Sequence, residues 1–180
     1  YAASGLTSKQ GRSHTFDSRA DGFGRGEACS SALIGEGEVP TRSQVVAATV
    51  RQDGKSASLT APNGKAQQAL IRVAHAEALN VPLCCLEAHG TGTALGDPIE
   101  ASAFAATVCR VSDQTSVGIG SVKSNLGHTE PSSGMVGMVN VVWSVERCNA
   151  APNAQLRVCN PHGVDQVGTN ACMMPTQLSQ

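Results

Sequence analysis

The sequence predicts an α/β fold built as layers of helices and strands around a mainly buried sheet. Short apolar or β-branched runs, typical of strands, alternate along the chain with stretches whose apolar residues recur at helical spacing. Hydrophobic residues make up 41% of the 180 residues and charged residues only 15%, which allows a real core. In folds of this class, catalytic and binding residues usually lie on the loops that follow the C-terminal ends of the strands.

Four short runs are predicted as strands. Residues 27–34 follow a polar, Gly-rich stretch over residues 1–26 that is expected to form a loop. Residues 44–51 alternate and are rich in β-branched side chains, residues 83–88 form a continuous apolar run, and residues 117–122 form another short run. Each of the four is expected to contribute one strand.

Helices are predicted over three stretches, residues 64–79, 97–108 and 131–147. In the second, Asp97 is expected to cap the N-terminus, and Glu100 to complete a capping box at the third helical position. Pro131 is expected to open the last helix, because proline is tolerated in a first turn. Gly134 and Gly137 are expected to let that helix pack closely against a neighbour.

Composition excludes several classes of protein. The net charge of −1 gives no basic field for nucleic acid, and one Trp, one Tyr and three Phe leave few platforms for stacking bases. No apolar run approaches the ~20 residues of a membrane span. The chain starts with Tyr1 and ends in a polar tail, so we expect a fragment of a longer protein.

Seven cysteines are present, at positions 29, 84, 85, 109, 148, 159 and 172. The number is odd and no C-x-x-C spacing occurs, which argues against a disulfide framework and against a zinc ribbon. Most are therefore expected to be buried, small hydrophobic side chains in a reducing compartment, which favours a cytoplasmic location. No metal site is expected.

The first loop with candidate chemistry spans residues 87–97 and follows a predicted strand. It holds His89 among three glycines, with the hydroxyl groups of Thr91 and Thr93 beside it. Such a loop could present an imidazole next to a cradle of backbone N–H groups, or it could be a tight turn with a structural histidine. A phosphate-binding loop is poorly supported, since no Gly-Lys-Ser/Thr follows.

The second such loop spans residues 120–130 and also joins a predicted strand to a helix. His128 lies just before a helix N-terminus, whose positive end disfavours imidazolium, so a neutral ring is expected. A neutral imidazole can donate a hydrogen bond to a developing oxyanion. Lys123 is either a solvated loop lysine or, if buried, needs a carboxylate partner.

These loops resemble the two histidine motifs of β-ketoacyl synthases, most closely those in ketosynthase domains of type I polyketide synthases. Residues 87–100 (EAHGTGTALGDPIE) resemble the first motif and residues 123–130 (KSNLGHTE) the second. Residues 16–27 and 52–64 resemble two further stretches of the same domain, in the same order. The resemblance covers residues 14 to about 162.

The resemblance implies a thiolase-like, layered αβαβα fold, present here as a partial domain, and a homodimer. Residues 1–180 would comprise the end of the N-terminal half and most of the C-terminal half. The family joins a Cys-bound acyl chain to a malonyl-type extender by decarboxylative Claisen condensation. Its substrates ride on the 4'-phosphopantetheine of acyl carrier protein, so carrier protein and other synthase domains are the implied partners, with no bound cofactor.

The resemblance also implies which residues form the site. By position, the implied catalytic residues are His89, His128, Lys123 and Glu100, with Thr91 and Thr93 contacting the phosphopantetheine arm. The histidines would polarise the extender carbonyl and stabilise the enolate, and Glu100 would pair with Lys123. For Glu100, the capping box alone would also explain its presence.

Two segments depart from the family pattern. Residues 28–31 (ACSS) match the context of the family nucleophile, but they lie downstream of residues 20–23 (ADGF), whereas the nucleophile lies upstream of that segment. We therefore expect Cys29 to be structural and the nucleophile to belong to sequence before Tyr1. Residues 168–172 weakly resemble the family's last loop, with Cys172 in place of its histidine.

Three hypotheses follow. The chain is part of an acyl-condensing ketosynthase, an acyltransferase of polyketide or fatty acid biosynthesis that would be inactive without its nucleophile. Alternatively, it is a non-catalytic ketosynthase-like module that binds carrier protein or a partner subunit. The third hypothesis is an unrelated hydrolase that uses Cys29 with His89 or His128.

Overall fold

The computed structural model describes residues 5–36, 41–56, 61–79, 81–108, 117–162 and 172–176. Its elements are, in chain order, α1 (Gly64–Glu77), β1 (Cys85–Glu87), α2 (Gly96–Val108), β2 (Val117–Gly120), α3 (Lys123–Leu126), the 3₁₀ helix η1 (Glu130–Ser132), α4 (Ser133–Arg147) and β3 (Cys172–Met173).

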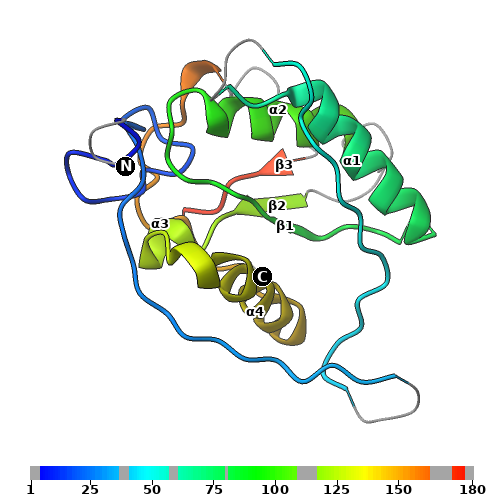
Figure 1. Cartoon of the computed structure of the whole chain (residues 1–180). Coiled ribbons are helices and arrows are strands. Elements are labelled where there is room, and N and C mark those ends of the chain that lie inside the picture. The colour runs from blue at the N-terminus through cyan, green and yellow to red at the C-terminus, as the bar shows by residue number, and fades with distance from the viewer. Residues whose placement is uncertain are drawn as a thin grey trace.

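The three strands form one parallel sheet in the order β1-β2-β3. Glu87 at the end of β1 lies opposite Gly120 at the end of β2, so the loops that follow the two strands leave the same edge. Helices α1 and α2 lie on one face of this sheet and α4 lies on the other (Figure 1). This three-layer arrangement confirms the predicted α/β class.

The core lies between β2 and α2. Val117 and Ile119 of β2 are almost completely buried, as are Ala101 and Phe104 of α2. Phe16 from the N-terminal loop joins the same cluster. Apolar side chains of the sheet and of one helix therefore fix the strand from which the second histidine loop departs.

The three predicted helices are confirmed, with boundaries shifted by a few residues. The strands predicted over 83–88 and 117–122 are confirmed as the shorter β1 and β2. The strands predicted over 27–34 and 44–51 are wrong, because the described residues there are irregular and Leu33 and Val50 are exposed. A strand is stable only when a neighbour accepts its backbone hydrogen bonds, and neither run has such a neighbour in the described part of the chain.

The start of α2 differs from its prediction. The helix begins at Gly96, whose N–H donates to Thr93 Oγ1 at 3.2 Å. Asp97 is not the N-cap. Its buried carboxylate instead accepts hydrogen bonds from the backbone N–H groups of Phe16 and Gly92. The capping box is also wrong, because the carboxylate of Glu100 binds the first histidine loop.

Helix α4 follows a turn of 3₁₀ helix that contains Pro131. A Cβ at Gly137 would lie 3.1 Å from Cγ of Glu87, so the predicted close packing is confirmed there. At Gly134 a Cβ would meet nothing within 4 Å, so the prediction is wrong for that residue.

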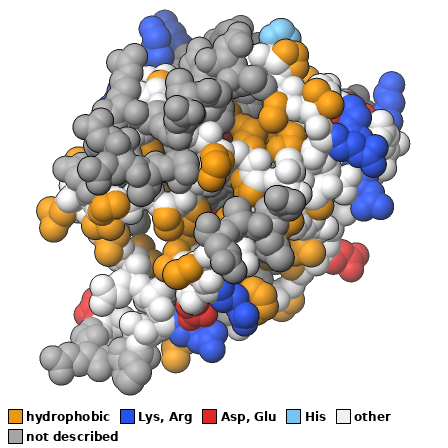
Figure 2. Space-filling model, turned by 180° about the vertical axis from the view of Figure 1, so that it is seen from behind, with side chains coloured by type: hydrophobic (Ala, Val, Ile, Leu, Met, Phe, Trp, Pro, Cys, Tyr) orange, Lys and Arg blue, Asp and Glu red, His pale blue; other side chains and the backbone are white. Residues whose placement is uncertain are grey.

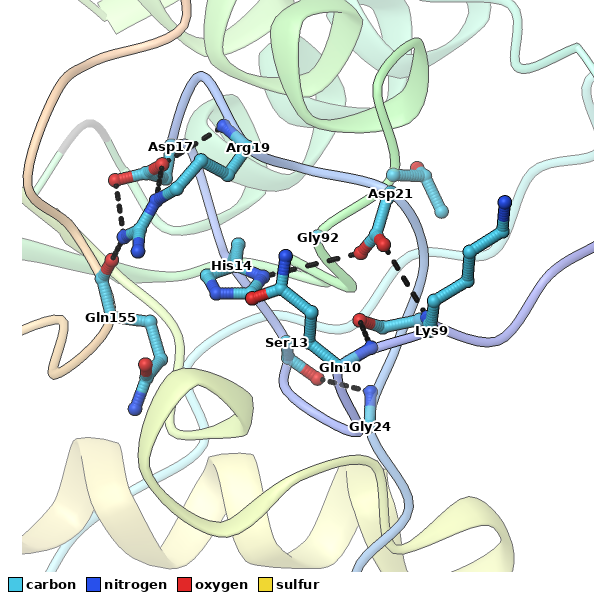
Figure 3. Close-up of polar contacts among 12 residues, drawn as sticks. Lys9, Gln10, Ser13, His14, Asp17, Arg19, Asp21, Gly24, Gly92 and Gln155 are labelled. Atoms are coloured by element: carbon cyan, nitrogen blue, oxygen red, sulfur yellow. Dashed lines mark hydrogen bonds and ion pairs between the residues drawn. The ribbon is translucent and has the colours of Figure 1, made fainter.

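The N-terminal loop, described from residue 5, is tied to the rest of the chain by polar contacts (Figure 3). Asp17 is completely buried and accepts from Arg19 Nε at 2.7 Å. It also accepts from the N–H groups of Arg157 and Val158 at 2.6 and 3.1 Å. His14, equally buried, lies 4.0 Å from Asp21. The loop is therefore anchored although it lacks regular structure.

The described cysteines are less buried than predicted. Cys29, Cys84 and Cys148 are exposed free thiols, so the expectation of burial is wrong for these three. Cys29 lies in the irregular segment and not in a strand. Cys172 is buried in β3 and is disulfide-bonded, contrary to the argument against disulfides. Within the described residues, no helix is long and apolar enough to cross a membrane.

Candidate active site

The two histidine loops meet at one edge of the sheet. His89 follows β1, and His128 follows β2 by way of α3. Their ring centroids lie 6.0 Å apart and the rings are nearly perpendicular, at 87°. The ring of Phe23 lies 5.0 Å from that of His128 on a centroid basis. Two imidazoles on different loops are thus held close enough to share one ligand atom.

The backbone of the first loop is held by Glu100. One carboxylate oxygen accepts from the N–H of His89 at 2.7 Å, and the other accepts from the N–H of Gly90 at 2.9 Å. Gly90 has a left-handed φ of 47°, and a Cβ there would lie 2.5 Å from Cβ of Ser121. Only glycine fits this approach of the two loops.

Asp97 organises the glycine-rich part of the same loop. Its carboxylate accepts from the N–H groups of Gly92 at 3.1 Å and Thr93 at 3.3 Å. Burial raises the pKa of Asp97 to about 6, while the hydrogen bonds from Phe16, Thr93 and Gly92 oppose that rise. Sequence reasoning assigned this carboxylate to the helix start and missed its role in the loop. The available signal was a carboxylate directly after a loop that holds three glycines.

The tautomer of His128 is set by its own loop. Nδ1 accepts a hydrogen bond from the backbone N–H of Glu130 at 2.9 Å. A neutral ring that accepts at Nδ1 carries its proton on Nε2. Burial lowers the pKa of His128, and Lys123 and His89 lower it further. The expectation of a neutral His128 is therefore supported.

His89 shares this electrostatic setting. Partial burial lowers its pKa, although the residue as a whole remains exposed. The negative charge of Glu100 raises the pKa and the positive charge of Lys123 lowers it, and the net direction is down. The surroundings of both imidazoles therefore favour the neutral form.

The second loop is braced by residues 24–26 of the N-terminal segment. The N–H of His128 donates to the carbonyl of Gly24 at 2.7 Å, and the N–H of Gly26 donates to the carbonyl of His128 at 3.0 Å. Arg25 and Glu130 form an ion pair at 3.3 Å. Sequence reasoning placed residues 24–26 in a loop but could not show that this loop positions His128.

Lys123 is the first residue of α3, and only 6% of it is exposed. Among the described residues, no carboxylate oxygen lies within 4.0 Å of its nitrogen, so Glu100 does not form the expected close ion pair. Burial lowers the pKa of Lys123, against the negative charges of Glu87, Glu100 and Asp97. The alternative of a solvated loop lysine is excluded.

The two threonines lie in the first loop. Thr91 is buried, and Thr93 accepts from Gly96 through its hydroxyl oxygen. Their contact with a phosphopantetheine arm stays a prediction. An open groove of about 830 Å³ runs beside α1 and α2, but its lining, which includes Lys55 and Ile99, contains none of the six predicted site residues.

Comparison with known proteins identifies the family. Residues 42–157 match the family described as Beta-ketoacyl synthase, C-terminal domain. A highly reducing polyketide synthase of Aspergillus terreus is 40% identical over 169 residues, covering 89% of this chain and 6% of that protein. A phenolphthiocerol/phthiocerol polyketide synthase of Mycobacterium tuberculosis is 40% identical over 167 residues, covering 88% and 9%.

Solved structures give the same result. The ketosynthase from module 6 of the bacillaene synthase from Bacillus subtilis has a TM-score of 0.83 at 27% identity, over 99% of this chain and 33% of that one. An oxazolomycin ketosynthase domain from Streptomyces albus has a TM-score of 0.83 at 27% identity, over 99% and 32%.

The layered fold is therefore thiolase-like, and the chain holds part of such a domain. More specifically, the chain belongs to the β-ketoacyl synthase C-terminal domain family, in the form found in type I polyketide synthases. It spans about a third of the ketosynthase chains it matches.

Proposed function

We propose that this chain supplies the two-histidine part of the site of a ketosynthase that performs decarboxylative Claisen condensation. The observation that carries the proposal is the pair of imidazoles of His89 and His128, with ring centroids 6.0 Å apart. The hydrogen bond at Nδ1 of His128 supports a proton on Nε2, the atom that a thioester oxygen would accept from.

The reaction divides into two bond changes. The carboxylate of a malonyl-type extender leaves as CO₂, and its bonding electrons pass into the thioester to form an enolate. Hydrogen bonds from the imidazoles stabilise the negative oxygen. The enolate carbon then attacks the acyl group on a cysteine, forming a carbon–carbon bond and releasing the cysteine thiolate.

Other parts of the proposal rest on the family. Glu100 fixes the backbone of His89, and buried Lys123 adds positive charge near both rings. Thr91 and Thr93 contact the 4'-phosphopantetheine of a carrier protein. The nucleophilic cysteine lies outside residues 1–180, and the complete enzyme is a cytoplasmic homodimer within a larger synthase of polyketide or fatty acid biosynthesis.

The alternative is a non-catalytic module that binds carrier protein or a partner subunit. Cys29, in the segment that matches the nucleophile context, is exposed and does not lie on a turn before a helix, so residues 1–180 offer no nucleophile there. Both candidates are compatible with that observation. Decarboxylation of a malonyl thioester distinguishes them, because a module that only binds would release no CO₂.

The test uses the complete polypeptide that contains this chain, with release of CO₂ from a malonyl thioester as the measurement. His89→Ala and His128→Ala are each expected to lower the rate about 100-fold or more. His75→Ala, on α1, is the matched control, because its ring lies near the carbonyl of Val81 and not in either histidine loop, and it is expected to keep the parent rate. Equal rates for all three variants would contradict the proposed function.

A further inference from the structure

Glu87 is a partly buried carboxylate at the end of β1 to which the proposed function gives no role. One of its oxygens, Oε1, accepts from the backbone N–H of Val122 at 2.8 Å. The other, Oε2, accepts from Nδ2 of Asn140 at 2.8 Å. The side chain thus joins β1 to the residue before Lys123 and to the middle of α4.

The packing around Glu87 is as specific as its hydrogen bonds. Helix α4 has Gly137 where the side chain crosses it, and a Cβ there would lie 3.1 Å from Cγ of Glu87. Burial raises the pKa of Glu87, while the hydrogen bonds from Val122 and Asn140 and the charge of Lys123 lower it. The Glu87 carboxylate thus has two hydrogen-bond donors and close packing against α4, which a buried carboxylate needs in order to be stable.

Three carboxylates on two elements act on the charge of Lys123. Glu87 lies on β1, while Glu100 and Asp97 lie on α2, and all three raise the pKa of Lys123 against the effect of burial, with Glu87 acting most strongly. His89 and His128 face the same group, and Lys123 lowers the pKa of each.

Two of these three carboxylates, those of Glu100 and Asp97, accept hydrogen bonds from backbone N–H groups of other segments. Both oxygens of Glu100 accept from the N–H groups of His89 and Gly90. The carboxylate of Asp97 accepts from Phe16, Gly92 and Thr93. Only Glu87 is hydrogen-bonded to the residue immediately before Lys123.

We propose that Glu87 is a positioning residue that holds the start of α3 through Val122 and supplies the negative charge that keeps Lys123 cationic beside the two histidines. Its effect on catalysis rests on the proposed function. Its effect on Lys123 does not, and the two can be measured separately.

The test compares Glu87→Gln with the parent in the complete polypeptide. Glutamine keeps the size and one acceptor oxygen but removes the charge. Competitive acetylation of Lys123 across the alkaline pH range, read by peptide mass spectrometry, gives the midpoint of its titration. We expect this midpoint to move to lower pH and malonyl decarboxylation to fall about tenfold. Glu77→Gln, an exposed glutamate on α1, is the matched control and should change neither.

A folded Glu87→Gln protein whose Lys123 titrates with the parent midpoint overturns the proposal. Glu87 would then act only as a hydrogen-bond acceptor, and its charge would not affect Lys123. Should this variant fail to fold, Asn140→Ala replaces it. That change frees Oε2 and lets the carboxylate move, so a smaller shift in the same direction is expected, and no shift overturns the proposal.

The two proposals fail differently. A parent polypeptide that releases no CO₂, but whose Lys123 midpoint falls in Glu87→Gln, contradicts the proposed function and supports the role of Glu87. A parent that releases CO₂ with an unmoved midpoint supports the function and overturns the role of Glu87.

Discussion

Asp17 shows how one buried side chain holds a loop without regular structure. Burial alone would raise its pKa, but hydrogen bonds from Arg19, Arg157 and Val158 hold the pKa well below its ordinary value. The unfolded carboxyl takes up a proton near pH ~4, whereas the folded one does not. The stability it contributes is therefore present above about pH 4 and is lost as the pH falls further.

We predict that Asp17→Asn weakens the docking of residues 13–23 by about 2 kcal/mol at neutral pH. Hydrogen exchange of the amides in that segment measures the effect, with faster exchange expected in the variant. The difference from the parent should shrink as the pH is lowered past about 4. Equal protection at neutral pH would show that Asp17 does not anchor the loop.

The two histidines predict a pH dependence of their own. Because burial lowers the pKa of both rings, they stay neutral to a pH below the ordinary value of about 6.5. Malonyl decarboxylation should therefore rise with pH and reach its plateau with a midpoint below that value. A pH–rate profile of kcat/KM gives the midpoint, and one above 6.5 would contradict neutral imidazoles as the active form.

At the scale of elements, α4 offers a matched pair of glycines in one helix. The Cβ added by Gly134→Ala would meet no atom within 4 Å. The higher helix propensity of alanine is therefore expected to raise the free energy of unfolding by about 0.5–1 kcal/mol. Gly137→Ala gains the same propensity but pushes on Glu87, which two hydrogen bonds hold in place. We expect it to be less stable than Gly134→Ala and slower in decarboxylation. Thermal unfolding and CO₂ release measure both, and an equal gain in stability would count against the packing.

Sequence reasoning predicted the helices well because their signals are local, as in the Asn63 cap that accepts from Lys65 and Ala66. It failed for residues 27–34 and 44–51 because a strand depends on a partner that periodicity does not reveal. The motifs identified His89 and His128. The brace at residues 24–26 escaped detection, because it depends on contact between residues about a hundred positions apart.

At the scale of the molecule, much apolar surface is uncovered. Hydrophobic side chains are visible over much of the face in Figure 2. Exposed large hydrophobic residues include Leu33 and Val50 in the irregular segment and Val139 and Trp143 on α4. Surfaces of this kind usually meet another surface. We predict that residues 1–180 expressed alone self-associate, as measured by light scattering, and a monodisperse monomer that melts cooperatively would contradict this.

The brace between residues 24–26 and His128, together with the contact of Asp17 and Val158, sets an order of events during synthesis. Residues 17–26 leave the ribosome more than a hundred residues before their partners, His128 and Val158. At about 5–20 residues per second, the early segment waits on the order of ten seconds. The site therefore forms late, and residues 17–26 of the nascent chain stay accessible to chaperones until these contacts form.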